Sequence, residues 1–291
     1  MFHGSLVAIV TPMKETGEVD YQAFERLVDW HIQNETDGLV VLGTTGESAT
    51  IEPAERKKLI EQAVSQVNGR IPVIIGTGAN ATNHAIDLTR QAMELGADAA
   101  LLVTPYYNKP TQEGLYQHYK AVADAVPIPQ ILYNVPSRTA CDLLPETVER
   151  LGHFSNIVAL KEATGDLDRL KQLLKMDCQM DFLSGEDPSS MEFMLLGGKG
   201  VISVAANVAP KLVHDMAAAA LAGNRQEAEK LNALLDVLNQ NLYVESNPIP
   251  AKWMLAEMGL IPHGIRLPLT PLDPKFHADL QGAMKEANLQ C

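Results

Sequence analysis

A lysine stands at the end of an apolar run, where the chain would otherwise be buried. Lys161 directly follows the sequence IVAL over residues 157–160. Burying an ammonium group is costly unless it is paired or neutral, and a neutral amine is the form of lysine that attacks a carbonyl to give a Schiff base. From spacing alone, an ion pair of Lys161 with Glu162 or Glu186 remains the alternative. The run therefore marks Lys161 as a candidate nucleophile.

A phenol and a guanidinium follow the preceding apolar run. Tyr133 closes the run that begins at residue 130, and Arg138 follows Pro136 and Ser137 in the next segment. A phenol close to an amine can carry protons while an imine forms, although a strand tyrosine more often serves packing. A guanidinium can hold a carboxylate through two parallel hydrogen bonds. The pair suggests imine chemistry on an anionic substrate.

Two further polar clusters follow earlier runs. Thr44 and Thr45 lie in a glycine-flanked turn, whose hydroxyl and backbone N–H groups could receive a small carboxylate. Without context an ordinary turn before a helix is the better explanation of these two residues. Tyr106 and Tyr107 follow the run that begins at residue 99. An amine, a phenol, hydroxyls and a guanidinium at one edge would together suit a 2-oxo acid.

The elements that must position these residues are short apolar runs bounded by Gly or Pro, each followed by helical periodicity. Such runs without alternation are typical of parallel strands buried on both faces. Asp20 is placed to cap the first helix, and Pro145, Pro188 and Pro210 stand where later helices would begin. The predicted strands cover residues 6–10, 38–42, 72–76, 99–103, 130–133, 157–161, 181–184 and 200–204.

Eight repeated βα units favour a closed (β/α)₈ barrel, a TIM barrel, over an open sheet, which more often has five or six parallel strands. After Pro210 only helical patterns follow, near residues 231–242, 251–257 and 275–286. We therefore expect a barrel over residues 1–224 and a C-terminal helical appendage over residues 225–291. Active sites of such barrels lie at the C-terminal ends of the strands, where these polar residues fall.

Composition excludes several classes of function. The chain has 23 Lys and Arg against 36 Asp and Glu, a formal charge of −13, which opposes binding to nucleic acid. The three cysteines, Cys141, Cys178 and Cys291, are far apart and form no CxxC pair, so neither a disulfide framework nor a structural zinc site is expected. The apolar run at residues 6–10 is too short to span a membrane. These features predict a cytoplasmic protein.

Two motifs point to other chemistry and are weak. Residues 76–81, GTGANA, fit GxGxxA, but Asp98 precedes the next strand where a dinucleotide site would need an acid at its end. The eight histidines show no HExxH or other ligand spacing. No dinucleotide, metal or other cofactor is expected.

The chain resembles the dihydrodipicolinate synthase family of the pyruvate-dependent aldolases, a superfamily that includes N-acetylneuraminate lyase. The likeness runs from residue 4 to about residue 271. Its most specific segments are GLVVLGTTGE over residues 38–47, YNVPSRT over residues 133–139 and LKEATG over residues 160–165. The resemblance implies condensation of pyruvate with L-aspartate 4-semialdehyde to 4-hydroxy-tetrahydrodipicolinate, on the route to diaminopimelate and lysine.

The resemblance also implies a role for each site residue. Lys161 would form the imine with pyruvate, Tyr133 would donate and accept protons, and Thr44 with Tyr107 would complete a proton relay. Tyr107 would come from a neighbouring subunit of a homotetramer built from dimers. The carboxylate of pyruvate would bind Thr45 and the backbone of Ile202, and Arg138 would hold the carboxylate of the aldehyde, which favours the synthase over the sugar-acid lyases.

One departure concerns regulation by lysine. Ala49, Asn80 and Tyr106 match a site between subunits of family members that lysine inhibits. The acidic residue that would hold the lysine amine is replaced by His84, and nearby histidines are replaced by Pro53 and Arg56. We expect weak or absent inhibition by lysine.

Two other interpretations stay open from the sequence. A related pyruvate-dependent lyase would act on another 2-oxo acid or aldehyde, and a panel of aldehydes would separate it from the synthase. A catalytically silent binding protein on the same scaffold would not need the amine of Lys161 beside Tyr133, Thr44, Thr45 and Arg138.

Overall fold

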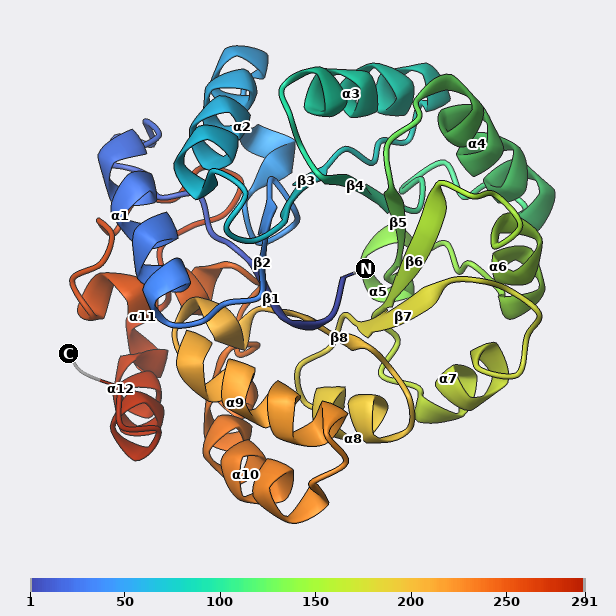
Figure 1. Cartoon of the computed structure of the whole chain (residues 1–291). Helices are drawn as coiled ribbons and strands as arrows, with labels where there is room; N and C mark the ends of the chain where they lie inside the picture. The colour runs from blue at the N-terminus through green and yellow to red at the C-terminus, as the bar shows by residue number, and fades with distance from the viewer. Residues whose placement is uncertain (1, 290–291) are drawn as a thin grey trace.

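The computed structural model describes residues 2–289 and contains one closed barrel of eight parallel strands in chain order (Figure 1). β1 closes the ring by pairing with β8, where Leu6 stands opposite Ile202. The predicted barrel is therefore confirmed. The strands are β1 Gly4–Ala8, β2 Gly38–Val41, β3 Val73–Gly76, β4 Ala99–Val103, β5 Gln130–Asn134, β6 Ile157–Glu162, β7 Asp181–Ser184 and β8 Gly200–Ser203.

The strands bury both faces, as the runs without alternation predicted. One set of side chains fills the barrel interior and includes Val40, Ile74, Ile131, Ala159 and Ile202. The alternate set faces the surrounding helices and joins larger apolar clusters. Because side chains alternate along a strand, Tyr133 lies on the inward face with Ile131, and Lys161 lies on the inward face with Ala159.

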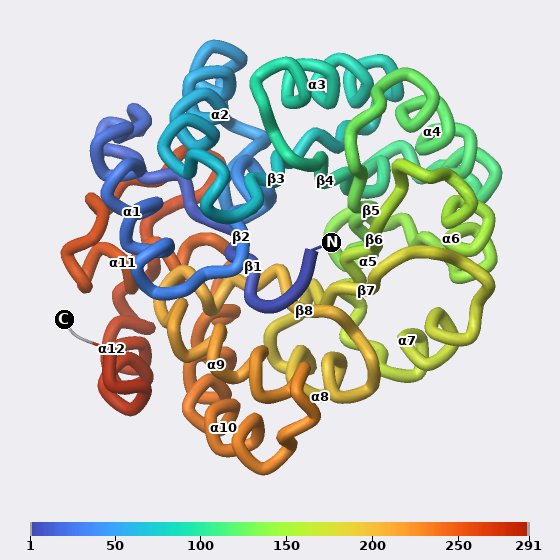
Figure 2. The backbone as a smooth tube through the Cα atoms, viewed as in Figure 1, coloured from blue at the N-terminus to red at the C-terminus, as the bar shows by residue number. Residues whose placement is uncertain are grey.

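A ring of helices surrounds the barrel, and Figure 2 follows the chain from each strand out to its helix. Asp20 caps α1 as predicted, since its carboxylate accepts from the backbone N–H groups of Gln22 and Ala23. Pro145 and Pro210 each open a helix, but Pro188 lies in a turn two residues before α8 begins at Ser190. The helices around the barrel are α1 Tyr21–Gln33, α2 Pro53–Val67, α3 Thr82–Glu94, α4 Gln112–Ala125, α5 Pro136–Thr139, α6 Pro145–Leu151, α7 Leu167–Leu173, α8 Ser190–Leu195 and α9 Pro210–Leu221.

Three helices follow the barrel, α10 Arg225–Asn241, α11 Ile249–Glu257 and α12 His277–Glu286. The predicted helical appendage is present, and Asn224 caps its first helix. Leu238 of α10, Met254 of α11 and Leu280 of α12 belong to the same apolar cluster as Val41 of β2. The C-terminal helices thus complete the core beside β1 and β2. A domain boundary at residue 224 stays a prediction.

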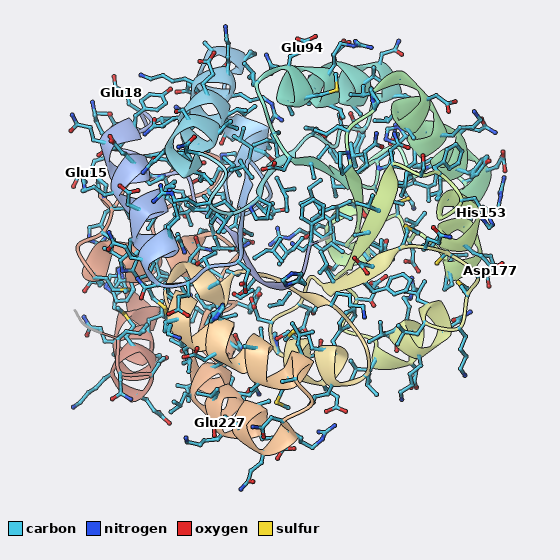
Figure 3. The ribbon with its side chains drawn as sticks, viewed as in Figure 1. Glu15, Glu18, Glu94, His153, Asp177 and Glu227 are labelled. Carbon is cyan, nitrogen blue, oxygen red and sulfur yellow. The ribbon has the colours of Figure 1, made fainter. Side chains whose placement is uncertain are left out.

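Acidic, basic and other polar side chains gather at the periphery of the ring of helices. Figure 3 labels six of them, which point outward at the rim: Glu15, Glu18, Glu94, His153, Asp177 and Glu227. No helix within residues 2–289 is long and apolar enough to cross a membrane. Cys141 and Cys178 are free thiols, whereas Cys291 lies outside the described residues.

Candidate active site at the carboxyl ends of the strands

Lys161 and Tyr133 stand side by side at the end of the barrel. The two residues are paired in register between β5 and β6, so both side chains enter the interior at the same height. The Nζ atom of Lys161 lies 4.3 Å from the centroid of the Tyr133 ring. Both side chains are buried, with Lys161 only 5% exposed. The structure therefore brings together the amine and the phenol that the sequence singled out.

The ion pair considered for Lys161 is absent. Within residues 2–289, Lys161 forms no hydrogen bond or salt bridge to either nearby glutamate. Glu162 accepts from the backbone N–H of Thr164 at 2.9 Å, and Glu186 accepts from the hydroxyl of Ser189 at 2.5 Å. Both carboxylates have other partners, and the amine of Lys161 has no acidic partner among the described residues.

A polar network lies behind the two residues and fixes the ends of β5 and β6. The amide of Asn134 donates to Glu162 at 3.1 Å and to Asp142 at 2.8 Å. Arg169 clamps Asp142 through two hydrogen bonds of 2.7 and 2.8 Å and lies 3.9 Å from Glu162. Burial raises the pKa of Glu162, which its hydrogen bonds from Asn134 and Thr164 only partly offset. This network holds the strand ends on which Tyr133 and Lys161 stand.

The glycine-flanked turn after β2 carries Thr44 and Thr45. Thr45 is buried, and its hydroxyl accepts from the amide of Asn247 at 2.9 Å. Thr44 is half-buried, and its carbonyl accepts from the backbone N–H of Glu47 at 3.1 Å. Ile202 is buried on β8 and takes part in the interior cluster with Tyr133. Thr45 thus follows β2 and Ile202 lies on β8, the two strands that pair with β1.

Arg138 is exposed on the short helix α5 after β5. Its guanidinium makes no hydrogen bond or ion pair with any residue between 2 and 289. An arginine without an internal partner remains able to bind a carboxylate from solution. The structure thus leaves it free, as the predicted role requires.

Tyr107 stands apart from the other predicted residues. It is 90% exposed, in a loop that gives it a φ of 76°, a conformation that is rare for residues other than glycine. Among the described residues, no hydrogen bond joins its hydroxyl to that of Thr44 or Tyr133. Within one chain the three hydroxyls therefore do not form the relay that the resemblance implies.

Of the residues matched to the lysine site, Asn80 contacts this loop. Asn80 accepts at its carbonyl from the side chain of Asn108 at 2.8 Å, which ties it to the loop of Tyr106 and Tyr107. His84 is exposed on α3, and Ala49 is exposed next to the turn after β2. Arg56 is buried and donates to the carbonyl of Gly76. Burial lowers its pKa to about 10, which leaves it cationic at neutral pH.

The motif at residues 76–81 has a packing explanation. A Cβ atom on Gly76 would lie 2.1 Å from the carbonyl oxygen of Leu42, and one on Gly78 would lie 2.4 Å from the nitrogen of Val103. Asp98 accepts from the backbone N–H of Val73 at 2.7 Å. Both glycines are thus needed where neighbouring backbones meet. Within the described chain, no group of three or more His, Cys, Asp or Glu is arranged to hold a metal ion.

Several residues at this end of the barrel had no role predicted from the sequence. Asn247 and Lys252 lie in the predicted appendage and received no role, yet Asn247 contacts Thr45 and Lys252 forms a buried ion pair with Glu47. Asp187 is buried and accepts from the backbone N–H groups of Val204 and Ala205 and from the hydroxyl of Tyr243. A lysine inside the otherwise apolar segment IPAKWML was the available signal for Lys252.

The chain is similar to characterised proteins over its whole length. Residues 1–287 match the Dihydrodipicolinate synthetase family. A protein of Coxiella burnetii (strain RSA 493 / Nine Mile phase I), named 4-hydroxy-tetrahydrodipicolinate synthase, is 62% identical over 291 residues, which is 100% of both chains. A protein of Pseudomonas aeruginosa with the same name is 56% identical over 291 residues, which cover 99% of this chain and 99% of the relative.

A solved structure gives the same result. The chloride-inhibited dihydrodipicolinate synthase of Acinetobacter baumannii, complexed with pyruvate, superposes with a TM-score of 0.98 at 52% identity and covers 100% of each chain. The dihydrodipicolinate synthase of Cyanidioschyzon merolae with lysine bound has a TM-score of 0.95 at 38% identity and covers 99% of each chain. Sequence and structure agree, and this chain belongs to the dihydrodipicolinate synthetase family.

Proposed function

We propose that this protein condenses pyruvate with L-aspartate 4-semialdehyde through a Schiff base on Lys161, giving 4-hydroxy-tetrahydrodipicolinate. The observation that carries the proposal is the buried amine of Lys161, which has no acidic partner in the described chain and lies 4.3 Å from the ring of Tyr133. The name of one relative gives the same product, and a solved relative is complexed with pyruvate.

In the first half of the reaction, Lys161 attacks the keto carbon of pyruvate, and water leaves as the imine forms. Thr45 and the backbone of Ile202 hold the carboxylate, which fixes the keto carbon over the amine. Loss of a proton from the methyl group then gives an enamine. Tyr133 is the proton donor and acceptor in these steps because its phenol lies next to Lys161.

In the second half, the enamine carbon attacks the aldehyde carbon of the semialdehyde and forms the new carbon–carbon bond. The free guanidinium of Arg138 holds the carboxylate of this substrate through paired hydrogen bonds. The substrate's own amine then attacks the imine carbon, which closes the ring and breaks the bond to Lys161. Atoms balance with one water released per turnover.

Completion of the site requires a second chain. The proton relay of Thr44, Tyr133 and Tyr107 closes when Tyr107, which is 90% exposed on its own chain, enters the site of a neighbouring subunit. We place the relay in a homotetramer built from dimers, located in the cytoplasm. A solved relative at 43% identity is a monomeric variant of dihydrodipicolinate synthase, and a molar mass of one chain in solution would overturn this part of the proposal.

The test is the intact mass of the protein after incubation with pyruvate and borohydride. Wild type is expected to gain one pyruvic acid less one oxygen atom, Lys161→Ala to gain nothing, and Lys14→Ala, which alters an exposed lysine, to behave as wild type. No adduct on wild type would overturn the Schiff-base mechanism.

Consumption of pyruvate with a panel of aldehydes then identifies the second substrate. The semialdehyde is expected to react fastest. Faster reaction with a sugar-derived aldehyde would favour a related pyruvate-dependent lyase. In Arg138→Ala we expect a higher KM for the semialdehyde and an unchanged concentration dependence for pyruvate trapping.

A further inference from the structure

A buried ion pair joins the C-terminal helices to the turn that carries Thr44 and Thr45. Lys252 of α11 donates to the carboxylate of Glu47, the residue that ends this turn. The side chains are 4% and 1% exposed. Removing one partner of a buried pair leaves an uncompensated charge, so such a pair holds its two elements in a defined position.

Glu47 transmits that position to Thr44 through the backbone. It stands in the left-handed region with a φ of 53°, and its N–H closes the turn on the carbonyl of Thr44 at 3.1 Å. The next residue, Ser48, donates to the carbonyl of Gly43 at 3.4 Å. A displacement of the Glu47 side chain would therefore strain the backbone that presents both threonines.

The same C-terminal segment makes further contacts with the turn and with the residues that follow it. The second carboxylate oxygen of Glu47 accepts from the backbone N–H of Arg266 at 3.3 Å. The guanidinium of Arg266 donates to the carbonyl of Thr50 at 2.6 Å and pairs with both oxygens of Glu55. Asn247 donates to the hydroxyl of Thr45 itself. The positive charges of Lys252 and Arg266 are thus compensated by the carboxylates of Glu47 and Glu55.

We propose that Lys252 is a positioning residue, whose ion pair with Glu47 fixes the turn of Thr44 and Thr45 and thereby sets the affinity of the site for the carboxylate of pyruvate. Lys252 acts through Glu47 and does not touch the substrate. The proposal rests on the proposed function, because it assumes that pyruvate binds beside Lys161.

The test is the pyruvate concentration that gives half-maximal adduct in the borohydride assay. Loss of one well-placed hydrogen bond to a charged group costs about tenfold in affinity, so Lys252→Met is expected to need at least about tenfold more pyruvate. At saturating pyruvate its final adduct should equal that of wild type, because Lys161 is untouched. Lys252→Arg keeps the charge and should recover most of the affinity.

Two controls separate positioning from loss of stability. Leu280→Ala removes a buried side chain of α12 and destabilises the same segment without touching the turn, so its half-saturating concentration should match wild type. Lys14→Met breaks an exposed lysine–glutamate pair and should also match. If the half-saturating pyruvate concentration rises equally in Leu280→Ala and Lys252→Met, the proposal is wrong.

The double variant Glu47→Gln/Lys252→Met covers the case in which Lys252→Met does not fold, since it leaves no unpaired buried charge. Its half-saturating pyruvate concentration should lie between those of wild type and Lys252→Met. The proposal is wrong if a folded Lys252→Met, or the double variant in its place, needs no more than about twice the wild-type pyruvate concentration. An absence of adduct on wild type would instead overturn the proposed function.

Discussion

Gly185 faces Lys161 so closely that it leaves no room for a side chain. A Cβ atom on Gly185 would lie 2.8 Å from Cε and 3.0 Å from Cγ of Lys161, and 2.7 Å from Cβ of Ala163. Real Cβ atoms essentially never approach other atoms this closely. The backbone N–H of Gly185 donates to the carbonyl of Glu162 at 2.7 Å, so the strand cannot move away without losing this bond. The missing side chain therefore sets the path of the Lys161 side chain toward Tyr133.

Gly185→Ala is expected to slow the formation of the pyruvate adduct by about 10²-fold, the scale of a 1 Å misplacement of a reacting group. The measurement is the rate of borohydride trapping at saturating pyruvate. Gly282→Ala, on α12 with open space around its Cα, is the matched control. Gly185→Ala/Ala163→Gly removes the clash with Ala163 alone, so a return to the wild-type rate would show that the strand, not Lys161, had been displaced.

Glu55→Gln removes the ion pair between Arg266 and Glu55 of α2, and its effect is tested through the pH dependence of stability. The hydrogen bond from Arg266 lowers the pKa of Glu55 below its ordinary value of 4.5. An acid whose pKa is lower in the folded state stabilises the fold above its ordinary pKa, and this contribution disappears as pH falls through the folded value.

The difference in urea midpoint between wild type and Glu55→Gln should therefore be largest above the ordinary pKa of 4.5 and shrink as the pH falls below it. Glu18→Gln alters an exposed pair with Lys14 and should show no such trend. A difference that stays constant or grows at low pH would contradict the assigned role of Arg266.

Much of this site could be predicted from the sequence because its residues extend strands. A strand fixes the side of each residue, so a lysine and a tyrosine that end neighbouring runs had to meet inside the barrel. Lys161 and Tyr133 do so, in register. The position of Arg138 just after β5 could also be predicted. The lack of an internal partner for its guanidinium could not, because it depends on the path of α5, which the pattern of apolar residues in the strands does not specify.

The contacts of the C-terminal helices could not be predicted in this way. Asn247 and Lys252 are separated from Thr45 and Glu47 by more than 200 positions, and nothing local in sequence specifies which face of the barrel α11 covers. The prediction that Pro188 opens a helix was wrong for a related reason: the turn after β7 continues to Ser189, whose backbone N–H donates to Glu186. Side-chain contacts, not periodicity, decide both features.

Asp20→Ala tests the predicted cap of α1. The carboxylate of Asp20 accepts from two backbone N–H groups at 2.9 and 3.1 Å, and loss of such a cap costs about 1 kcal/mol. The free energy of unfolding, measured by urea denaturation, should fall by about this amount. Asp20→Asn keeps an acceptor oxygen and should retain most of the stability. Equal losses in both variants would mean that charge, and not the cap, is what matters.

The response to lysine follows from the charges around residues 56 and 84. The exposed His84 offers no carboxylate to an ammonium group, and the buried Arg56 adds a positive charge. We expect that about 1 mM lysine, a concentration that saturates a micromolar site, leaves the condensation rate unchanged. His84→Glu restores a carboxylate and should increase inhibition. Strong inhibition of wild type below this concentration would refute the assignment.

Mixing two inactive variants tests whether Tyr107 completes the site of a neighbouring chain. Lys161→Ala lacks the nucleophile, and Tyr107→Phe lacks the exposed hydroxyl. In a dimer of one chain of each kind, the site that keeps Lys161 receives Tyr107 from its partner and is intact. Random mixing gives such dimers half of the time, so about a quarter of all sites should regain activity. The measurement is the condensation rate after the two variants are unfolded and refolded together, with each variant refolded alone as the control. If Tyr107 serves its own chain, no mixed dimer contains an intact site and the mixture stays as inactive as its parts.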